Sequence, residues 1–130
     1  MKERLLLDTD VLIDYLRGRE AAVEWLEART EDLLVSVITV SELAVGIRGE
    51  EEDQALEEFL DLFEVVPLDR SIASRSGRIR QAHGAASSMS LADAVIAASA
   101  ISREAVLQTF NWRHYPTVER IQEPYDRGSA

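Results

Sequence analysis

Acidic residues occur at three points of the sequence where the neighbouring residues are apolar. They are Asp8 and Asp10 after the run Leu5–Leu7, Glu42 between "VSVITV" and "LAVGI", and Asp93 before "AVIAASAI". A buried carboxylate is costly unless it is paired or bound to a metal. Carboxylates that meet also raise one another's pKa values unless cations lie among them. Because Mg²⁺ and Mn²⁺ prefer oxygen ligands, the pattern predicts a divalent metal site.

A carboxylate-held divalent metal is suited to reactions of phosphate esters. The ion lowers the pKa of a bound water, which becomes the nucleophile, and it stabilises the charge that grows on the phosphoryl oxygens. The sequence has no G-x-S-x-G, P-loop or G-x-G-x-x-G motif, and it has no cysteine nucleophile. We therefore expect hydrolysis of a phosphate ester with metal assistance.

Each polar residue of this set also has a purely structural explanation. Asp10 could cap the N-terminus of a helix. The segments T-V-S-E and S-L-A-D, which end at Glu42 and Asp93, match the capping box. Asn111 could stabilise a turn. Capping acids work best at the surface, whereas Glu42 and Asp93 adjoin apolar segments, so we favour the metal site over capping alone.

Strands and helices are expected to alternate along the chain. The expected strands are 4–8, 32–37, 64–68, 105–109 and, more weakly, 118–122. The expected helices are 10–17, 20–29, 39–49, 54–63 behind an acidic run, an arginine-bearing helix that breaks near His83–Gly84, and 90–101. This alternation predicts an α/β protein with a parallel sheet covered on both faces. Ligands of such sheets bind beyond the carboxyl ends of the strands, where Asp8 lies.

Length and composition predict one domain with its own core. The absence of cysteine excludes disulfides and thiolate metal sites. The apolar run after Arg4 is too short for a signal peptide, and the longest apolar helix, Ala94–Ile101, is too short to span a membrane. We therefore expect a cytoplasmic protein without a membrane partner.

The net charge of −10 counts against a nucleic-acid partner, although bound metal ions would supply positive charge at the site itself. Lys2 is the only lysine, whereas there are thirteen arginines. Arginine presents a rigid fork of donors that suits phosphate. We predict phosphate contacts from Arg75, Arg78, Arg80, Arg113 and Arg120. The alternative is that the arginine-bearing helix simply exposes a solvated face.

Four segments, in this order and spacing, resemble the PIN-domain ribonucleases of the VapC toxin type: "LLLDTDVLIDYLRG", "SVITVSELAVGI", "SLADAVIAASA" and "VLQTFNWRHY". The resemblance extends from Leu5 to Gln122. It implies a three-layer α/β/α sandwich with a mainly parallel sheet of four to five strands. We expect this domain over residues 1–124, followed by a polar tail, 125–130, that frays. One departure is "AHGAASSMS", which is richer in small residues than the family pattern.

The resemblance also implies an activity and roles for individual residues. The activity is that of an Mg²⁺- or Mn²⁺-dependent endoribonuclease, the toxin of a toxin–antitoxin pair, with an antitoxin partner and a homodimer. Asp8, Glu42 and Asp93 match the family's metal-binding acids, and Asn111 matches a fourth, more variable catalytic position. The residues expected to support them are Thr9, Asp10 and Thr109.

Three alternatives compete with this interpretation. The first is an RNA-processing PIN nuclease without a toxin role, and the second is a non-catalytic PIN module that binds RNA or a partner. Retention of the three principal carboxylates disfavours the second. The third, a phospho-receiver domain, requires a lysine after its last strand, and Lys2 lies at the opposite end of the chain.

Overall fold

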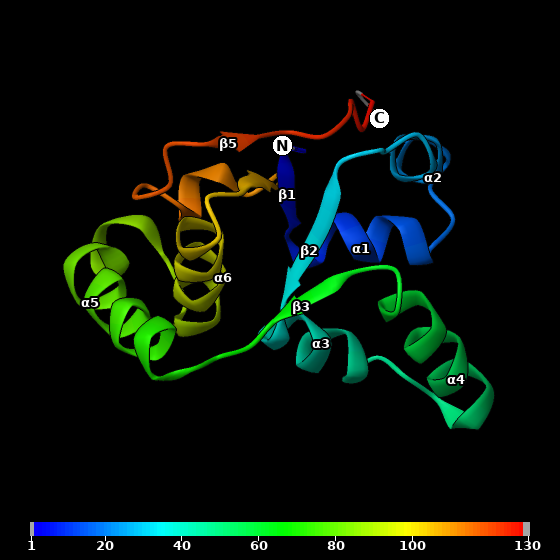
Figure 1. Cartoon of the computed structure of the whole chain (residues 1–130), viewed down its shortest axis with the longest axis horizontal. Helices are drawn as coiled ribbons and strands as arrows, with labels where there is room; N and C mark the ends of the chain where they lie inside the picture. Colours follow the sequence, from blue (N-terminus) through cyan, green and yellow to red (C-terminus); the bar gives the residue numbers. More distant parts are fainter. Residues whose placement is uncertain (1, 129–130) are drawn as a thin grey trace.

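A single parallel sheet organises the computed structural model, which describes residues 2–128. Within these residues the sheet has five strands, ordered β3-β2-β1-β4-β5. The strands are β1 (Arg4–Leu7), β2 (Asp32–Ser36), β3 (Glu64–Val66), β4 (Val106–Gln108) and β5 (Ile121–Gln122). Each neighbouring pair is parallel, which confirms the predicted fold class. Strand order reverses at β1, so the crevice beyond its carboxyl end is the expected place for a site (Figure 1).

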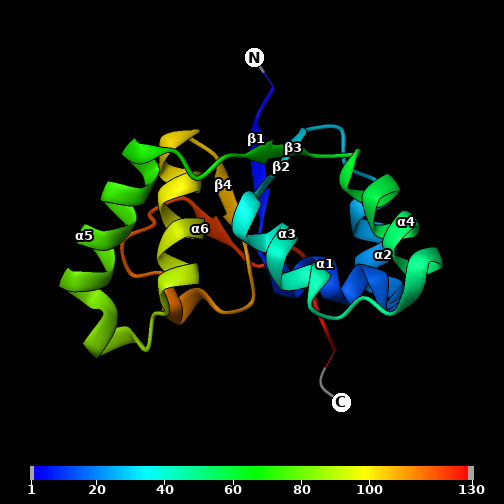
Figure 2. The ribbon, with the colours of Figure 1, turned by 90° about the horizontal axis from the view of Figure 1, so that it is seen from below.

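Helices cover both faces of the sheet and complete three layers. The helices are α1 (Thr9–Leu16), α2 (Glu20–Glu27), α3 (Val37–Ala44), α4 (Gly49–Leu60), α5 (Arg70–Ser87), α6 (Leu91–Ser102) and the short 3₁₀ helix η1 (Trp112–His114). Figure 2 shows α5 and α6 on one side of the sheet and α1, α2 and α4 on the other. Within the described chain, no helix combines the length and apolarity needed to cross a membrane.

The three consecutive leucines of β1 explain this layering. Side chains of a strand alternate between its two faces. Leu6 packs in the core beneath α5 and α6, whereas Leu5 and Leu7 pack in the core beneath α1, α2 and α4. All three side chains are buried. The carboxylate of Asp8 therefore follows a strand that is fixed from both sides.

Several predicted helix boundaries are wrong. α4 begins at Gly49 and ends at Leu60, so the acidic run lies in its first turns and not before it. α3 begins at Val37, directly after β2, because the Ser36 hydroxyl accepts the N–H of Ile38 and caps the helix. Thr39 is thus inside the helix and does not cap it. α5 does not break near His83–Gly84 but continues to Ser87. The helix formers around Gly84 offset its cost of about 1 kcal/mol.

The C-terminal segment is packed against α1 and α2. The Tyr125 hydroxyl donates to Asp14 Oδ2 at 2.7 Å, and Arg127 Nε donates to the same oxygen at 2.9 Å. Asp14 is a buried carboxylate that requires such partners. The Tyr125 ring also packs edge-on against Phe110. The expected fraying is therefore wrong for residues 125–128, while 129–130 lie outside the described residues.

Candidate functional site

Asp8 is the central carboxylate at the carboxyl end of β1. It is the N-cap of α1, a role that the structural alternative drawn from the sequence gave to Asp10, and its Oδ1 accepts the N–H of Thr9 at 2.8 Å. Its Oδ2 accepts the hydroxyl of Thr109 at 2.7 Å and that of Tyr115 at 2.9 Å. Burial, and then the charge of Asp10, raises the pKa of Asp8 from 3.8 to about 7, against the opposing effect of these hydrogen bonds.

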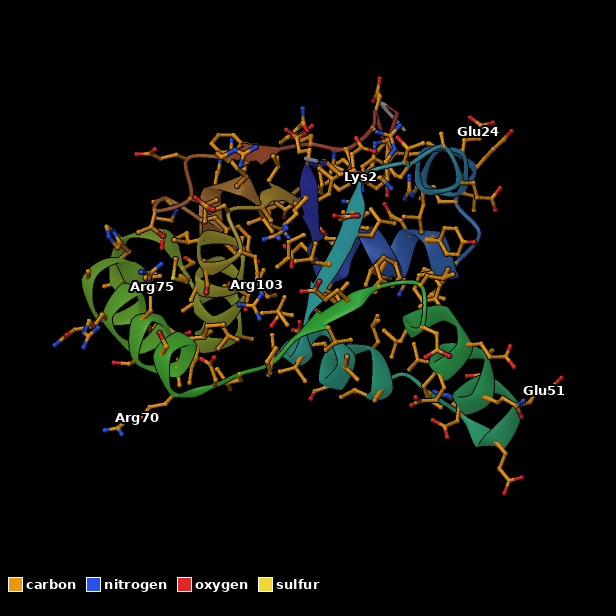
Figure 3. All side chains as sticks on the ribbon, viewed as in Figure 1. Lys2, Glu24, Glu51, Arg70, Arg75 and Arg103 are labelled. Carbon is orange, nitrogen blue, oxygen red and sulfur yellow. The ribbon has the colours of Figure 1, made fainter. Side chains whose placement is uncertain are left out.

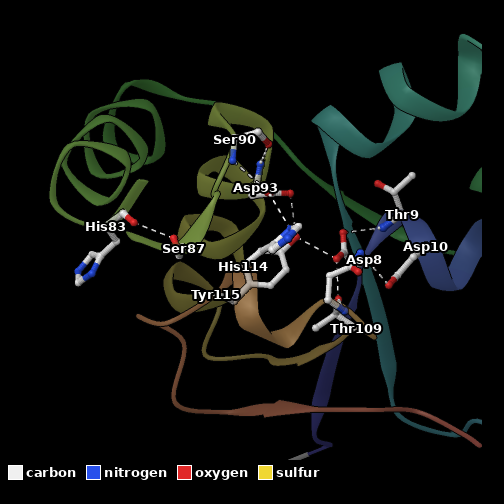
Figure 4. A network of polar contacts seen from close by, with 11 residues as sticks. Asp8, Thr9, Asp10, His83, Ser87, Ser90, Asp93, Thr109, His114 and Tyr115 are labelled. Atoms are coloured by element: carbon white, nitrogen blue, oxygen red, sulfur yellow. Dashed lines mark hydrogen bonds and ion pairs between the residues drawn. The ribbon is translucent and has the colours of Figure 1, made fainter. Parts of the chain in front are cut away.

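Asp93 reaches the same place from the first turn of α6 (Figure 4). It forms the predicted capping box with Ser90: its Oδ2 accepts the Ser90 N–H, and its own N–H donates to the Ser90 hydroxyl. Its Oδ1 also lies 3.4 Å from the Tyr115 hydroxyl, and Oδ2 lies 3.5 Å from His114 Nδ1. Capping and participation in the site are therefore compatible.

Glu42 is connected to this centre through a threonine. Its Oε1 accepts the hydroxyl of Thr9 at 2.6 Å, and Thr9 directly follows Asp8. Thr9 Oγ1 also lies 3.0 Å from Thr39 Oγ1, which is fully buried inside α3. The early start of α3 thus places Thr39 where it helps to fix Thr9. The Glu42 residue itself is exposed.

Asp10 and Asn111 form a second polar group beside the first. Asp10 Oδ2 accepts the N–H of Phe110 at 3.0 Å and the side-chain amide of Asn111 at 3.3 Å. The N–H of Asn111 donates to the Thr109 hydroxyl, which connects the two groups. Burial raises the pKa of Asp10, and among the described residues its Oδ1 has no hydrogen-bond partner.

The donor set fits a hard divalent cation. Among residues 2–128, the only ion pair made by these carboxylates is the one between Asp93 and His114; the charge of Arg127 opposes the rise in the pKa of Asp10 without forming an ion pair with it. In the same residues, no three His, Cys, Asp or Glu side chains are grouped so that they could hold one ion. Mg²⁺ commonly uses one or two carboxylates and completes its shell with water and phosphate oxygens. Asp8 and Asp93 can provide that pair.

Residues 5–119 match the PIN domain. The chain belongs to the PIN-domain family. Relatives are similar to it over most of both chains. Ribonuclease VapC10 of Mycobacterium tuberculosis is 36% identical over 127 residues, covering 93% of this chain and 92% of that protein. Ribonuclease VapC1 of Methanocaldococcus jannaschii is 34% identical over 126 residues, covering 94% and 84%.

Solved structures agree with this assignment. A toxin–antitoxin complex from Klebsiella pneumoniae contains a chain that superposes with a TM-score of 0.80 at 31% identity. The match covers 94% of this PIN domain chain and 98% of that chain. The resemblance read from the four sequence segments is thereby confirmed.

The structure of this PIN domain brings most of the predicted site residues into one hydrogen-bonded network. Asp8, Asp93 and Thr109 meet through hydroxyl groups, Glu42 joins through Thr9, and Asn111 joins through Asp10. Whether Asp8, Glu42 and Asp93 all bind metal stays a prediction. Sequence reasoning missed Tyr115, His114 and Thr39. The first two lie in the segment "NWRHY" after β4, where a hydroxyl and an imidazole close to Asn111 were the available signal.

The predicted phosphate-binding arginines are not gathered into one surface. Arg75, Arg78 and Arg80 are exposed on α5, the helix on which Figure 3 labels Arg75. Five residues turn a helix by about 140°, so Arg75 and Arg80 lie on different sides of α5. Arg113 stacks on the Trp112 ring, whereas Arg120 donates to Glu104 and Glu3. Phosphate contacts by these residues stay a prediction.

Proposed function

We propose that this protein is an endoribonuclease that depends on Mg²⁺ or Mn²⁺ and acts as the toxin of a toxin–antitoxin pair. Both relatives described above are named ribonucleases, and the matched Klebsiella structure is a toxin–antitoxin complex. The observation that carries the proposal is the meeting of Asp8 and Asp93 at the Tyr115 hydroxyl, at the carboxyl edge of a parallel sheet. The same chemistry requires carboxylates that are free of strong basic partners.

Each residue of the network then has a task in phosphodiester hydrolysis. The divalent ion supplies an activated water and positive charge beside the scissile phosphate. Asp8 and Asp93 would hold the ion, and Glu42, which accepts the Thr9 hydroxyl on the α3 side, would add negative charge beside them without completing a three-carboxylate group. The exposed side chain of Asn111, placed by Asp10, is available to the substrate phosphate.

The partner surface that we propose for the antitoxin is a groove between α1, α3 and α4. It has a volume of about 570 Å³, and its apolar lining includes Leu16, Leu43, Ile47 and Leu56. Glu42 also lines it, so the groove leads directly to the site. An antitoxin segment with an apolar face and a basic residue would fill the groove and neutralise the carboxylates. Antitoxin and RNA both meet the protein in the cytoplasm, the location that we propose.

A matched pair of substitutions tests this surface. Leu16 and Leu68 are 47% and 45% exposed, but only Leu16 lines the groove. Leu16→Glu is expected to abolish co-purification with the antitoxin, whereas Leu68→Glu is expected to retain it. Retention by Leu16→Glu would place the antitoxin elsewhere.

Cleavage of RNA by the purified chain tests the activity. We expect cutting of RNA with Mg²⁺ or Mn²⁺, no cutting in EDTA, and loss of cutting in Asp8→Asn and Asp93→Asn. Asp61→Asn is the matched control, because Asp61 is an exposed carboxylate at the end of α4, far from the carboxyl edge of the sheet. Cutting by Asp8→Asn at the rate of Asp61→Asn would refute the assignment. A non-catalytic PIN module would show no cutting by any of these proteins.

A further inference from the structure

Tyr115 is a buried tyrosine whose hydroxyl stands between two carboxylates. The residue follows η1, is 2% exposed, and its ring packs in the core beneath α5 and α6. Its hydroxyl is 2.9 Å from Asp8 Oδ2 and 3.4 Å from Asp93 Oδ1. One side chain thus joins β1, α6 and the segment after β4.

The contacts of the two carboxylates show which oxygens remain available. Among residues 2–128, Asp8 Oδ2 accepts two hydroxyl donors, from Thr109 and Tyr115, whereas Oδ1 accepts only the N–H of Thr9. Within the same part of the chain, Asp93 Oδ2 accepts the N–H of Ser90 and lies near His114, whereas the one hydrogen-bond partner of Oδ1 is Tyr115. Each carboxylate therefore has one oxygen held by the protein and one with a free lone pair.

The number of protons on the Tyr115 hydroxyl adds a second constraint. A phenol has one proton to donate. The shorter distance favours donation of this proton to Asp8, so the hydrogen bond to Asp93 Oδ1 is the weaker of the two. The two carboxylates repel each other when both are ionised, and a cation close to both would remove that repulsion.

We propose that Tyr115 is a positioning residue that orients Asp8 and sets its separation from Asp93, so that their free oxygens bind one divalent metal ion. This inference rests on the proposed function and deepens it. Residues that hold metal ligands in place commonly contribute tenfold to a hundredfold to metal affinity. The ring alone would fill the core, so the hydroxyl group is the part that serves the site.

The test is Mn²⁺ binding to the whole chain without RNA, measured by electron paramagnetic resonance, with Tyr115→Phe and a matched control. Tyr125→Phe removes a hydroxyl that also bonds a buried carboxylate, Asp14, outside the site. We expect Tyr115→Phe to weaken Mn²⁺ binding by about tenfold or more and Tyr125→Phe to bind like the unchanged protein. In RNA cleavage, Tyr115→Phe should need correspondingly more Mg²⁺ for half-maximal rate and regain most of its rate at saturation.

The Mn²⁺ binding and RNA cleavage results separate the positioning role of Tyr115 from the proposed function of the protein. Mn²⁺ affinity of Tyr115→Phe equal to that of Tyr125→Phe would overturn the positioning role while leaving the proposed function intact. An unchanged protein that neither binds Mn²⁺ nor cuts RNA would overturn the proposed function, and this inference with it. If Tyr115→Phe does not fold, Thr109→Val removes the other hydroxyl from Asp8 Oδ2. Weaker Mn²⁺ binding by that variant supports the role of these hydroxyls, and unchanged binding contradicts it.

Discussion

Replacing Asp8 by asparagine is expected to make the metal-free protein more stable at pH 8 and less stable at pH 4. The buried Asp8 carboxyl has a pKa of about 7, compared with an ordinary value of 3.8. The folded protein therefore binds this proton more tightly than the unfolded chain does. The stability that results is complete below pH 3.8 and is lost as the pH rises through 7. At about 1.36 kcal/mol per pKa unit, the loss amounts to about 4 kcal/mol.

Asparagine removes the charge but also disturbs the hydrogen bonds that the Asp8 carboxylate accepts. Its one oxygen can accept from Thr109 and Tyr115, and its NH₂ group then faces the N–H of Thr9. Leaving such donors unpaired costs about 1–3 kcal/mol at every pH. The difference in free energy of unfolding, Asp8→Asn minus the unchanged protein, should therefore rise by about 4 kcal/mol between pH 4 and pH 8. It should be negative at pH 4 and positive at pH 8.

Urea unfolding in EDTA, followed by tryptophan fluorescence from pH 4 to pH 8, measures this difference. Asp61→Asn is the control for loss of an exposed carboxylate, and its difference from the unchanged protein should vary little with pH. Added Mg²⁺ should stabilise the unchanged protein and not Asp8→Asn. A difference between Asp8→Asn and the unchanged protein that stays constant or falls as the pH rises would refute this reasoning.

Three further predictions address other parts of the molecule. Tyr125→Phe removes a donor from the buried Asp14, so urea unfolding should show a loss of about 1–2 kcal/mol. Gly84→Ala should raise the free energy of unfolding by up to about 1 kcal/mol, because α5 is continuous and the atoms nearest to the added methyl group belong to the exposed Arg80 side chain, which has to move aside. A loss of more than about 1 kcal/mol would contradict this. If Arg78 and Arg80 both contact single-stranded RNA, the double alanine variant should reduce the salt slope of RNA binding by about 1.4, and an unchanged slope would show that α5 is only a solvated face.

Much of the fold follows from local patterns in the sequence. The leucines of β1 and the apolar runs of the other strands are sufficient for a parallel sheet with helices between its strands. Helix ends were less predictable, because Ser36 and Thr39 are both residues that can cap a helix, and in the structure Ser36 caps α3 while Thr39 lies inside it. Gly84 was misleading because helix formers surround it. The packing of the C-terminal segment depends on Asp14, whose need for partners is visible only once α1 is folded.

The site was predictable as far as residue type and chain direction allow. Asp8 follows an apolar strand and Asp93 opens an apolar helix, and chain direction places both at the same edge of the sheet, so their proximity could be inferred from the sequence. Tyr115 could not be inferred, because the reach of its hydroxyl depends on the turn at η1 and on the packing of its ring. Glu42 illustrates the same limit: its position was foreseen, but its contact through Thr9 depends on the register of α3.

The central claim is that Asp8 and Asp93 together hold a divalent ion. Diffraction from crystals soaked in Mn²⁺, recorded where manganese scatters anomalously, tests it most directly. An anomalous peak about 2.0–2.4 Å from an oxygen of each of these two carboxylates is the predicted result. A fully soaked crystal with no peak there, or with the peak bound to other carboxylates, would contradict the claim.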